Sequence, residues 1–268
     1  MQIDHFRVGD LQLAASSVGN GRSFVFLHGL CGDARQPVEM FPMDCGWRCH
    51  AMECRGHGHS EMGDHSALSI SRFADDVAVF LETLDDQSPV IGGISMGAAI
   101  ALRLVAMHPN LASGLVLARP AWVDLPAPST LAPHRDIATL MATHELAMAR
   151  RLFEASDTAH IVKDVSPDNL ASLLGFFDRQ PSEQTQALLA AVAADGPGVD
   201  RARIAAIDLP TLIIGTDRDF VHPISMAQEL ASLITGAHLA HITAKSDNRD
   251  AHIAEFRRAL RQFLMEIE

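Results

Sequence analysis

Six short apolar runs, bounded mostly by glycine, proline or polar residues, limit most strongly what this chain can fold into. They cover residues 23–28, 48–53, 90–94, 114–118, 211–214 and 238–242. Runs of this length are typical of strands buried on both faces, as in a parallel sheet. Before them, residues 2–18 alternate enough to predict an antiparallel hairpin that turns at Val8-Gly9-Asp10.

Apolar residues recur at helical spacing between and after these runs. Such stripes cover residues 70–84, 224–234 and 253–267, and residues 98–107 form a further Ala/Leu-rich helical stretch. Strands that alternate with helices form βαβ units. We therefore predict an α/β fold of three layers, a mostly parallel sheet with helices on both faces.

Residues 124–207 interrupt this alternation. They contain no clear strand run, are rich in alanine and leucine, and are punctuated by prolines. We expect several short helices, inserted between two strands as a lid (cap). The predicted organisation is a core of residues 1–123 and 208–268 with a helical lid at 124–207.

Charge and composition limit the partners of the chain. The formal net charge is −12, which argues against a nucleic-acid partner. No apolar run approaches the length of a membrane helix, and the first residues lack the pattern of a signal peptide. We expect a cytoplasmic protein without a membrane partner, and the oligomeric state is left open.

The four cysteines lie in the first fifth of the chain, at positions 31, 45, 49 and 54. In a reducing compartment we expect free thiols rather than disulfides. Histidines 50, 57 and 59 are close in sequence, but a C-x-x-C pair and a second ligand pair at zinc spacing are missing. We therefore predict no metal site.

The motif that carries most chemistry is Gly93-Ile94-Ser95-Met96-Gly97. It follows an apolar run and precedes a helical stretch, which is the context of a G-x-S-x-G nucleophile elbow. A glycine-rich turn with a surface serine is the alternative. The patterns of a phosphate-binding loop and of a dinucleotide-binding turn are absent. Ser95 is thus the predicted nucleophile.

Two further motifs accompany the elbow. The first run ends in Phe26-Leu27-His28-Gly29-Leu30-Cys31-Gly32, and the second ends in Met52-Glu53-Cys54-Arg55-Gly56-His57-Gly58-His59-Ser60. Together the three motifs resemble the α/β-hydrolase fold family, although Glu53 stands where aspartate is usual. The resemblance covers residues of about 20–120 and 208–268.

The resemblance implies an oxyanion hole made by the backbone amides of Leu30 and Met96. Two preorganised N–H groups of this kind stabilise the charge on a tetrahedral intermediate. The resemblance also implies that His28, His57 and His59 support their loops rather than catalyse.

The triad of this fold follows the chain order serine, acid, histidine. The acid is expected in the loop Thr216-Asp217-Arg218-Asp219-Phe220-Val221-His222-Pro223, where two aspartates compete. The family pattern places a proline four residues after the acid. Asp219 fits this spacing and Asp217 does not, so Asp219 is the predicted acid.

The base is expected after the last strand. The candidate histidines are His222, His238, His241 and His252. His252 follows the loop at residues 245–251 and opens the last helix, which is the expected place, although its loop is longer than in many relatives. We predict His252 as the base, with His241 as the alternative.

These residues predict a serine hydrolase that cleaves a small ester, lactone, thioester or related acyl substrate through an acyl-enzyme, without a cofactor. A dehalogenase or epoxide hydrolase of this fold would need an aspartate nucleophile in place of Ser95. An acyltransferase with the same triad and a non-catalytic receptor are the alternatives.

Two residues beyond the triad are candidates for substrate contact. Arg119 and Trp122 follow the run at 114–118, and Arg119 can hold a substrate carboxylate or form a salt bridge with a nearby acidic residue. The apolar residues of the lid favour a mostly apolar acyl group.

Overall fold

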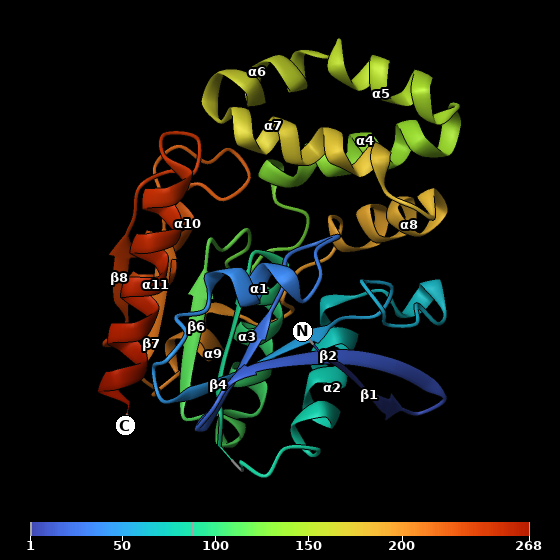
Figure 1. Cartoon of the computed structure of the whole chain (residues 1–268). Coiled ribbons are helices and arrows are strands. Elements are labelled where there is room, and N and C mark those ends of the chain that lie inside the picture. Colours follow the sequence, from blue (N-terminus) through green and yellow to red (C-terminus); the bar gives the residue numbers. More distant parts are fainter. Residues whose placement is uncertain (1, 87, 268) are drawn as a thin grey trace.

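The computed structural model describes residues 2–86 and 88–267. Eight strands form one sheet in the order β1-β2-β4-β3-β5-β6-β7-β8 (Figure 1). Strand β2 is antiparallel to both neighbours, and all other neighbouring strands are parallel. The strands are β1 (Ile3–Val8), β2 (Leu11–Gly19), β3 (Arg22–Leu27), β4 (Trp47–Glu53), β5 (Val90–Ile94), β6 (Gly114–Ala118), β7 (Thr211–Gly215) and β8 (His238–His241).

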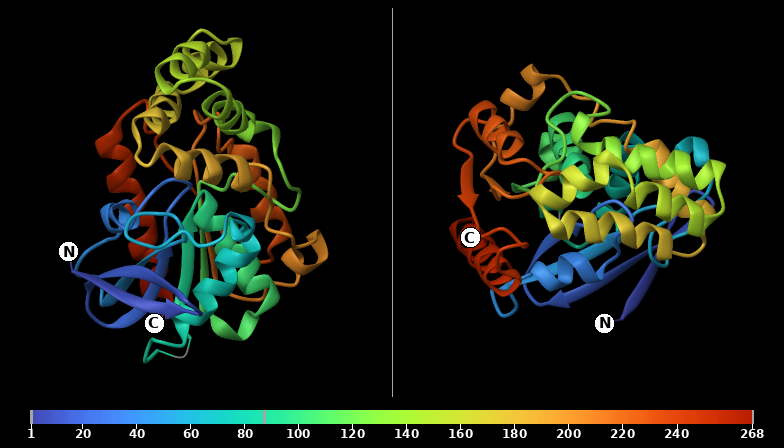
Figure 2. Two further views of the ribbon diagram at one scale, coloured as in Figure 1. Left: turned by 90° about the vertical axis from the view of Figure 1, so that its right-hand side faces the viewer. Right: turned by 90° about the horizontal axis from the view of Figure 1, so that it is seen from above.

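Helices cover both faces of this sheet, which confirms the predicted three layers (Figure 2). One face carries α2 (Ile70–Leu81), α3 (Met96–Met107), α9 (Arg201–Ala205) and α10 (Ile224–Leu233). The other carries α1 (Arg35–Met40) and α11 (Arg249–Glu266), whose Phe256 lies in a buried cluster with Phe26 and Trp47. Across residues 2–86 and 88–267, no helix is both long and apolar enough to cross a membrane.

The predicted hairpin and all six predicted strands are present. The expectation that every run is buried on both faces is wrong for the last one. Strand β8 pairs only with β7, at the edge of the sheet, and its terminal residues His238 and His241 are exposed.

All regular secondary structure between β6 and β7 is helical. Helices α4 (Ala132–Thr143), α5 (Leu146–Glu154), α6 (Asp157–Val165), α7 (Pro167–Leu174) and α8 (Ser182–Val192) follow one another. They pack on each other and lie over one end of the sheet, at the top of Figure 1. We call residues 132–192 the helical segment. In contrast, α9 packs against α3 and α10.

Candidate active site

Ser95 lies in the turn between β5 and α3 with a positive φ of 57°, a conformation that side chains rarely adopt. The flanking glycines allow this turn to close. A Cβ on Gly93 would lie 2.1 Å from the backbone of Gly97, and a Cβ on Gly97 would lie 2.5 Å from the carbonyl oxygen of Leu27. The predicted strand–turn–helix context of Ser95 is therefore confirmed.

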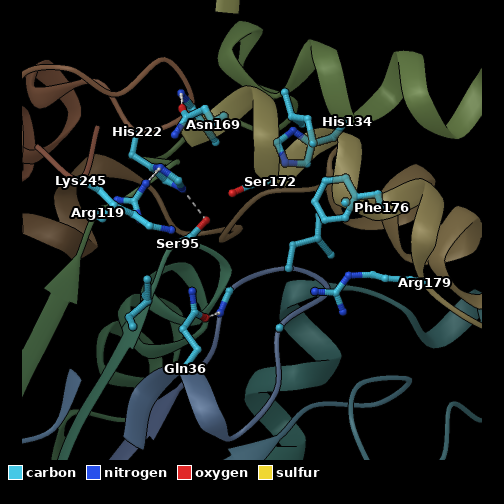
Figure 3. A pocket seen from close by; sticks show the side chains of 17 residues that line it. Gln36, Ser95, Arg119, His134, Asn169, Ser172, Phe176, Arg179, His222 and Lys245 are labelled. Atoms are coloured by element: carbon cyan, nitrogen blue, oxygen red, sulfur yellow. Dashed lines mark hydrogen bonds between the residues drawn. The ribbon is translucent and has the colours of Figure 1, made fainter. Parts of the chain in front are cut away.

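The partner of Ser95 is His222, in the loop between β7 and α10 (Figure 3). The Ser95 hydroxyl is 2.8 Å from Nε2 of His222. On the other side of the ring, Nδ1 is 2.9 Å from Oδ1 of Asp219. Because a carboxylate can only accept, these partners assign the imidazole proton to Nδ1 and leave Nε2 free to accept the Ser95 proton.

Arg119, directly after β6, binds the second oxygen of the same carboxylate. Its Nε and Nη2 donate to Oδ2 of Asp219 at 2.8 and 2.5 Å. Burial raises the pKa of Asp219, but Arg119 and His222 outweigh burial and hold this pKa well below its usual range. Burial and Arg119 together lower the pKa of His222, despite the opposing charge of Asp219. At neutral pH the site therefore combines an ionised carboxylate with a neutral imidazole.

Two side chains of the helical segment hold the loop between the acid and the imidazole. The Ser166 hydroxyl, directly before α7, accepts the backbone N–H of Phe220 at 2.9 Å. On α7 itself, Oδ1 of Asn169 accepts the backbone N–H of Val221 at 3.0 Å. Ser166 and Asn169 are both buried. Neither residue carries a signal in the sequence, because their partners are backbone groups distant in the chain.

His252 does not make the contact predicted for the base. It lies in the first turn of α11, buried, with Nδ1 2.9 Å from the carbonyl oxygen of Thr243. Among the described residues, no hydrogen bond joins His252 to Ser95 or Asp219. The loop after β8 turns at Ala244, and its Thr243 carbonyl binds the His252 ring. His222 occupies the position beside Ser95.

The alternative base and the competing acid bind each other at the surface. Nε2 of His241 is 2.9 Å from Oδ2 of Asp217, and both side chains are more than half exposed, at 54% and 64%. This contact is solvated and lies outside the hydrogen-bonded chain that begins at Ser95.

The two backbone amides proposed for the oxyanion hole belong to Met96, which directly follows Ser95, and to Leu30, which lines the same cavity. Met96 is the first residue of α3, where backbone N–H groups have no partner within the helix. Leu30 lines the same cavity as Ser95, and the preceding amide of Gly29 is held by Oε1 of Gln36 at 2.7 Å. In residues 2–86 and 88–267, neither the Leu30 nor the Met96 amide donates to a protein atom.

Arg119 and Trp122 have different surroundings. Arg119 borders the cavity, but its guanidinium is engaged by Asp219, which is the salt-bridge alternative. Trp122 is buried, and its Nε1 donates to the carbonyl oxygen of Asp195 at 2.9 Å. It is not among the residues that line this cavity, so its predicted substrate contact stays a prediction. Its indole instead attaches the chain after β6 to the chain after α8.

In the two glycine-rich loops, His28, His57 and Glu53 form hydrogen bonds with backbone groups. Nε2 of His28 accepts the backbone N–H of Cys54 at 3.0 Å. The Glu53 carboxylate accepts the backbone N–H groups of Ala34 and His59, at 3.1 and 2.6 Å. Glu53 therefore links the loop after β3 to the loop after β4. A glutamate in place of the usual aspartate is thus compatible with the fold.

The cysteines are buried free thiols, as predicted. Burial raises the pKa of Cys31 to about 12, so this thiol is protonated at neutral pH. Within the part of the chain that the structure describes, no three His, Cys, Asp or Glu residues are grouped so that they could hold a metal ion.

A cavity of about 320 Å³ lies between the helical segment and the carboxyl edge of the sheet (Figure 3). The core contributes Leu30, Ser95 and His222 to its lining. The helical segment contributes polar side chains and two apolar ones, namely His134, Asn169, Ser172, Leu173, Phe176 and Arg179. Ser95 thus lines a partly open cavity of the size of a small-molecule site.

Comparisons with known proteins agree with this architecture. A sequence model described as alpha/beta hydrolase fold matches residues 22–247. The chain is 29% identical over 227 residues to the AB hydrolase superfamily protein YisY of Bacillus subtilis (strain 168), covering 81% of this chain and 82% of that protein. It is 24% identical to pyrrolizixenacetamide deacetylase of Xenorhabdus hominickii, covering 97% of both.

Among solved structures, a bromoperoxidase from Bacillus anthracis has the same fold. It superposes with a TM-score of 0.76 at 19% identity, covering 98% of this chain and 100% of that one. The family match extends over most of the chain and includes the elbow and both glycine-rich loops. The chain therefore belongs to the α/β-hydrolase fold family and is an enzyme of this superfamily.

Proposed function

We propose that the protein is a serine hydrolase that cleaves a small carboxylic ester or related acyl substrate through an acyl-enzyme. The observation that carries this proposal is the chain of hydrogen bonds from Ser95 through His222 to Asp219. A serine hydroxyl is a weak nucleophile until a base takes its proton, and the base needs an orienting group. The cavity in front of Ser95 leaves room for the substrate.

Acylation begins when Ser95 Oγ attacks the acyl carbon and passes its proton to Nε2 of His222. Asp219 holds the other ring nitrogen and stabilises the imidazolium. The backbone amides of Leu30 and Met96 hold the negative oxygen of the tetrahedral intermediate. The intermediate collapses as His222 gives its proton to the leaving oxygen and the carbon–oxygen bond breaks.

Deacylation repeats these steps with water. His222 takes a proton from water as the water oxygen attacks the acyl carbon, and the second intermediate releases the acid and restores the Ser95 hydroxyl. The helical segment acts as a lid in this proposal, since it roofs the cavity and presents Leu173 and Phe176 to the acyl chain.

A fluorophosphonate probe tests the nucleophile. We expect covalent labelling of Ser95, mapped by mass spectrometry, and hydrolysis of 4-nitrophenyl esters, both abolished in Ser95→Ala. Ser172→Ala is the matched control, because this serine lines the same cavity but its hydroxyl donates to the Asp168 carbonyl oxygen at 2.9 Å. A folded protein without labelling contradicts the proposal. Labelling with acyl transfer to alcohols but not to water assigns an acyltransferase.

A further inference from the structure

The lining of the cavity has an unexpected charge. Among the described residues, three cationic side chains and no Asp or Glu line it: Arg119, Arg179 and Lys245. The whole chain has 33 acidic against 21 basic residues, so its composition predicts the opposite balance. Arg119 is paired with Asp219, which leaves Arg179 and Lys245 to act on a ligand.

Arg179 faces the cavity from the helical segment. Figure 3 shows it on the opposite side of Ser95 from Lys245. In the described parts of the chain, its guanidinium has no ion pair and no hydrogen-bond acceptor. The positive charge of Arg179 also acts on the loop of the proposed oxyanion hole. It lowers the pKa of Cys31 there, against the stronger effect of burial, which raises this pKa to about 12.

His134 lines the same cavity with a neutral ring. It is buried on α4, and burial lowers its pKa to about 3, so the ring is neutral at physiological pH. Its Nδ1 has no hydrogen-bond partner in residues 2–86 and 88–267. Buried polar atoms in folded proteins rarely lack a partner. The neutral ring therefore adds no charge to the wall, and the charge of the lining comes from the cationic side chains.

We propose that the acyl part of the substrate carries a carboxylate and that Arg179 binds it, an inference that rests on the serine hydrolase proposed above. A guanidinium matches a carboxylate with two parallel hydrogen bonds. Leu173 and Phe176 also line the cavity, and in the proposed complex they contact the methylene groups that join the ester carbonyl to the carboxylate. The acyl group thus has an apolar middle and an anionic end.

Matched esters test this proposal kinetically. We expect kcat/KM for the mono-4-nitrophenyl ester of adipic acid to exceed that for 4-nitrophenyl hexanoate, and this preference to fall about tenfold in Arg179→Gln, mainly through KM. Arg179→Lys keeps the charge and retains part of the preference. The matched control is Arg151→Gln, an exposed arginine of α5 outside the cavity lining, which leaves the preference unchanged.

A binding measurement separates this inference from the proposed function. Titration calorimetry on Ser95→Ala, which cannot form an acyl-enzyme, compares monomethyl adipate with methyl hexanoate. We expect tighter binding of the charged ester and its loss on adding Arg179→Gln. Equal affinity for both esters, or a preference that Arg179→Gln leaves intact, overturns the carboxylate site. If the charged ester binds through Arg179 but Ser95 is neither labelled nor active, the site stands and the hydrolase proposal fails.

Discussion

Of two neighbouring loops at the carboxyl edge of the sheet, one places a histidine beside Ser95 and the other does not. The loop after β7, residues 216–223, places His222 against the serine hydroxyl. The loop after β8, residues 242–248, binds the ring of His252 with its own Thr243 carbonyl and exposes Lys245 to the cavity. The strands that carry the two loops are parallel neighbours. The order of the strands therefore does not decide which histidine lies beside Ser95.

The two loops also differ in how they are fixed. Three successive amides of the first loop, those of residues 220–222, are accepted by buried Ser166, Asn169 and Asp219. In the second loop, the amide of Thr243 is accepted by Glu255, whose side chain is near the surface. The first loop is held by buried groups of both the helical segment and the core, and this rigidity suits a base that must stay within hydrogen-bond distance of a hydroxyl.

Asp219→Asn tests the first loop with the largest expected effect. An amide in place of the carboxylate no longer fixes the Nδ1 proton or stabilises the imidazolium, so we expect kcat/KM to fall by about a thousandfold or more. Ester hydrolysis at neutral pH measures this. Asp217→Asn is the control, because Asp217 pairs with His241 at the surface. Similar losses in both variants would contradict the assignment of the acid.

Asn169→Ala tests whether the helical segment positions the base. Losing the acceptor of the Val221 amide frees the loop beside His222, and we expect kcat to fall about tenfold with a smaller change in KM. Asn169→Asp retains an acceptor oxygen and restores most of kcat. Ser172→Ala, on the same helix and in the same cavity, is the control. An unchanged kcat in Asn169→Ala would show that the loop holds itself.

Arg119→Met tests the electrostatics of the first loop. His222 must be neutral to act as a base, so activity rises with pH through its pKa, which lies below the ordinary value of 6.5. Burial and Arg119 lower this pKa, and Asp219 and Asp168 raise it. Removing the positive charge therefore moves the acidic limb of the kcat/KM profile to higher pH. An acidic limb that stays in place or moves to lower pH would contradict this account.

The fold and the nucleophile could be predicted because their signals are local. Short apolar runs specify strands, and the glycine motif around Ser95 is read within five residues, although Gly97 is required by the close approach of Leu27 from β3. The acid follows from the spacing of Asp219 to Pro223. The proposed base, His222, differs from the predicted His252, because chain order favoured a histidine after the last strand. The sequence did hold one signal for His222. It follows Asp219 by three residues, a spacing at which a tight loop can bring the imidazole against the carboxylate.

Other features of the site depend on tertiary contacts that one sequence does not reveal. Arg119 and Asp219 are distant in the chain, and they meet because β6 and β7 are neighbours. The support from Ser166 and Asn169 depends on where α7 lies over the sheet. The contact of Trp122 with the Asp195 carbonyl was not predictable for the same reason, since this partner comes from beyond the helical segment.

The most direct test of the central claim is the rate at which a fluorophosphonate labels Ser95 in His222→Ala and in His252→Ala. Thermal melting of both variants first establishes that each is folded. With His222 as the base, labelling slows about a thousandfold in His222→Ala, in the range of general-base contributions, and stays within about tenfold of the parent rate in His252→Ala. Rapid labelling of His222→Ala together with loss of labelling in His252→Ala would contradict the account and identify His252, at the start of α11, as the base.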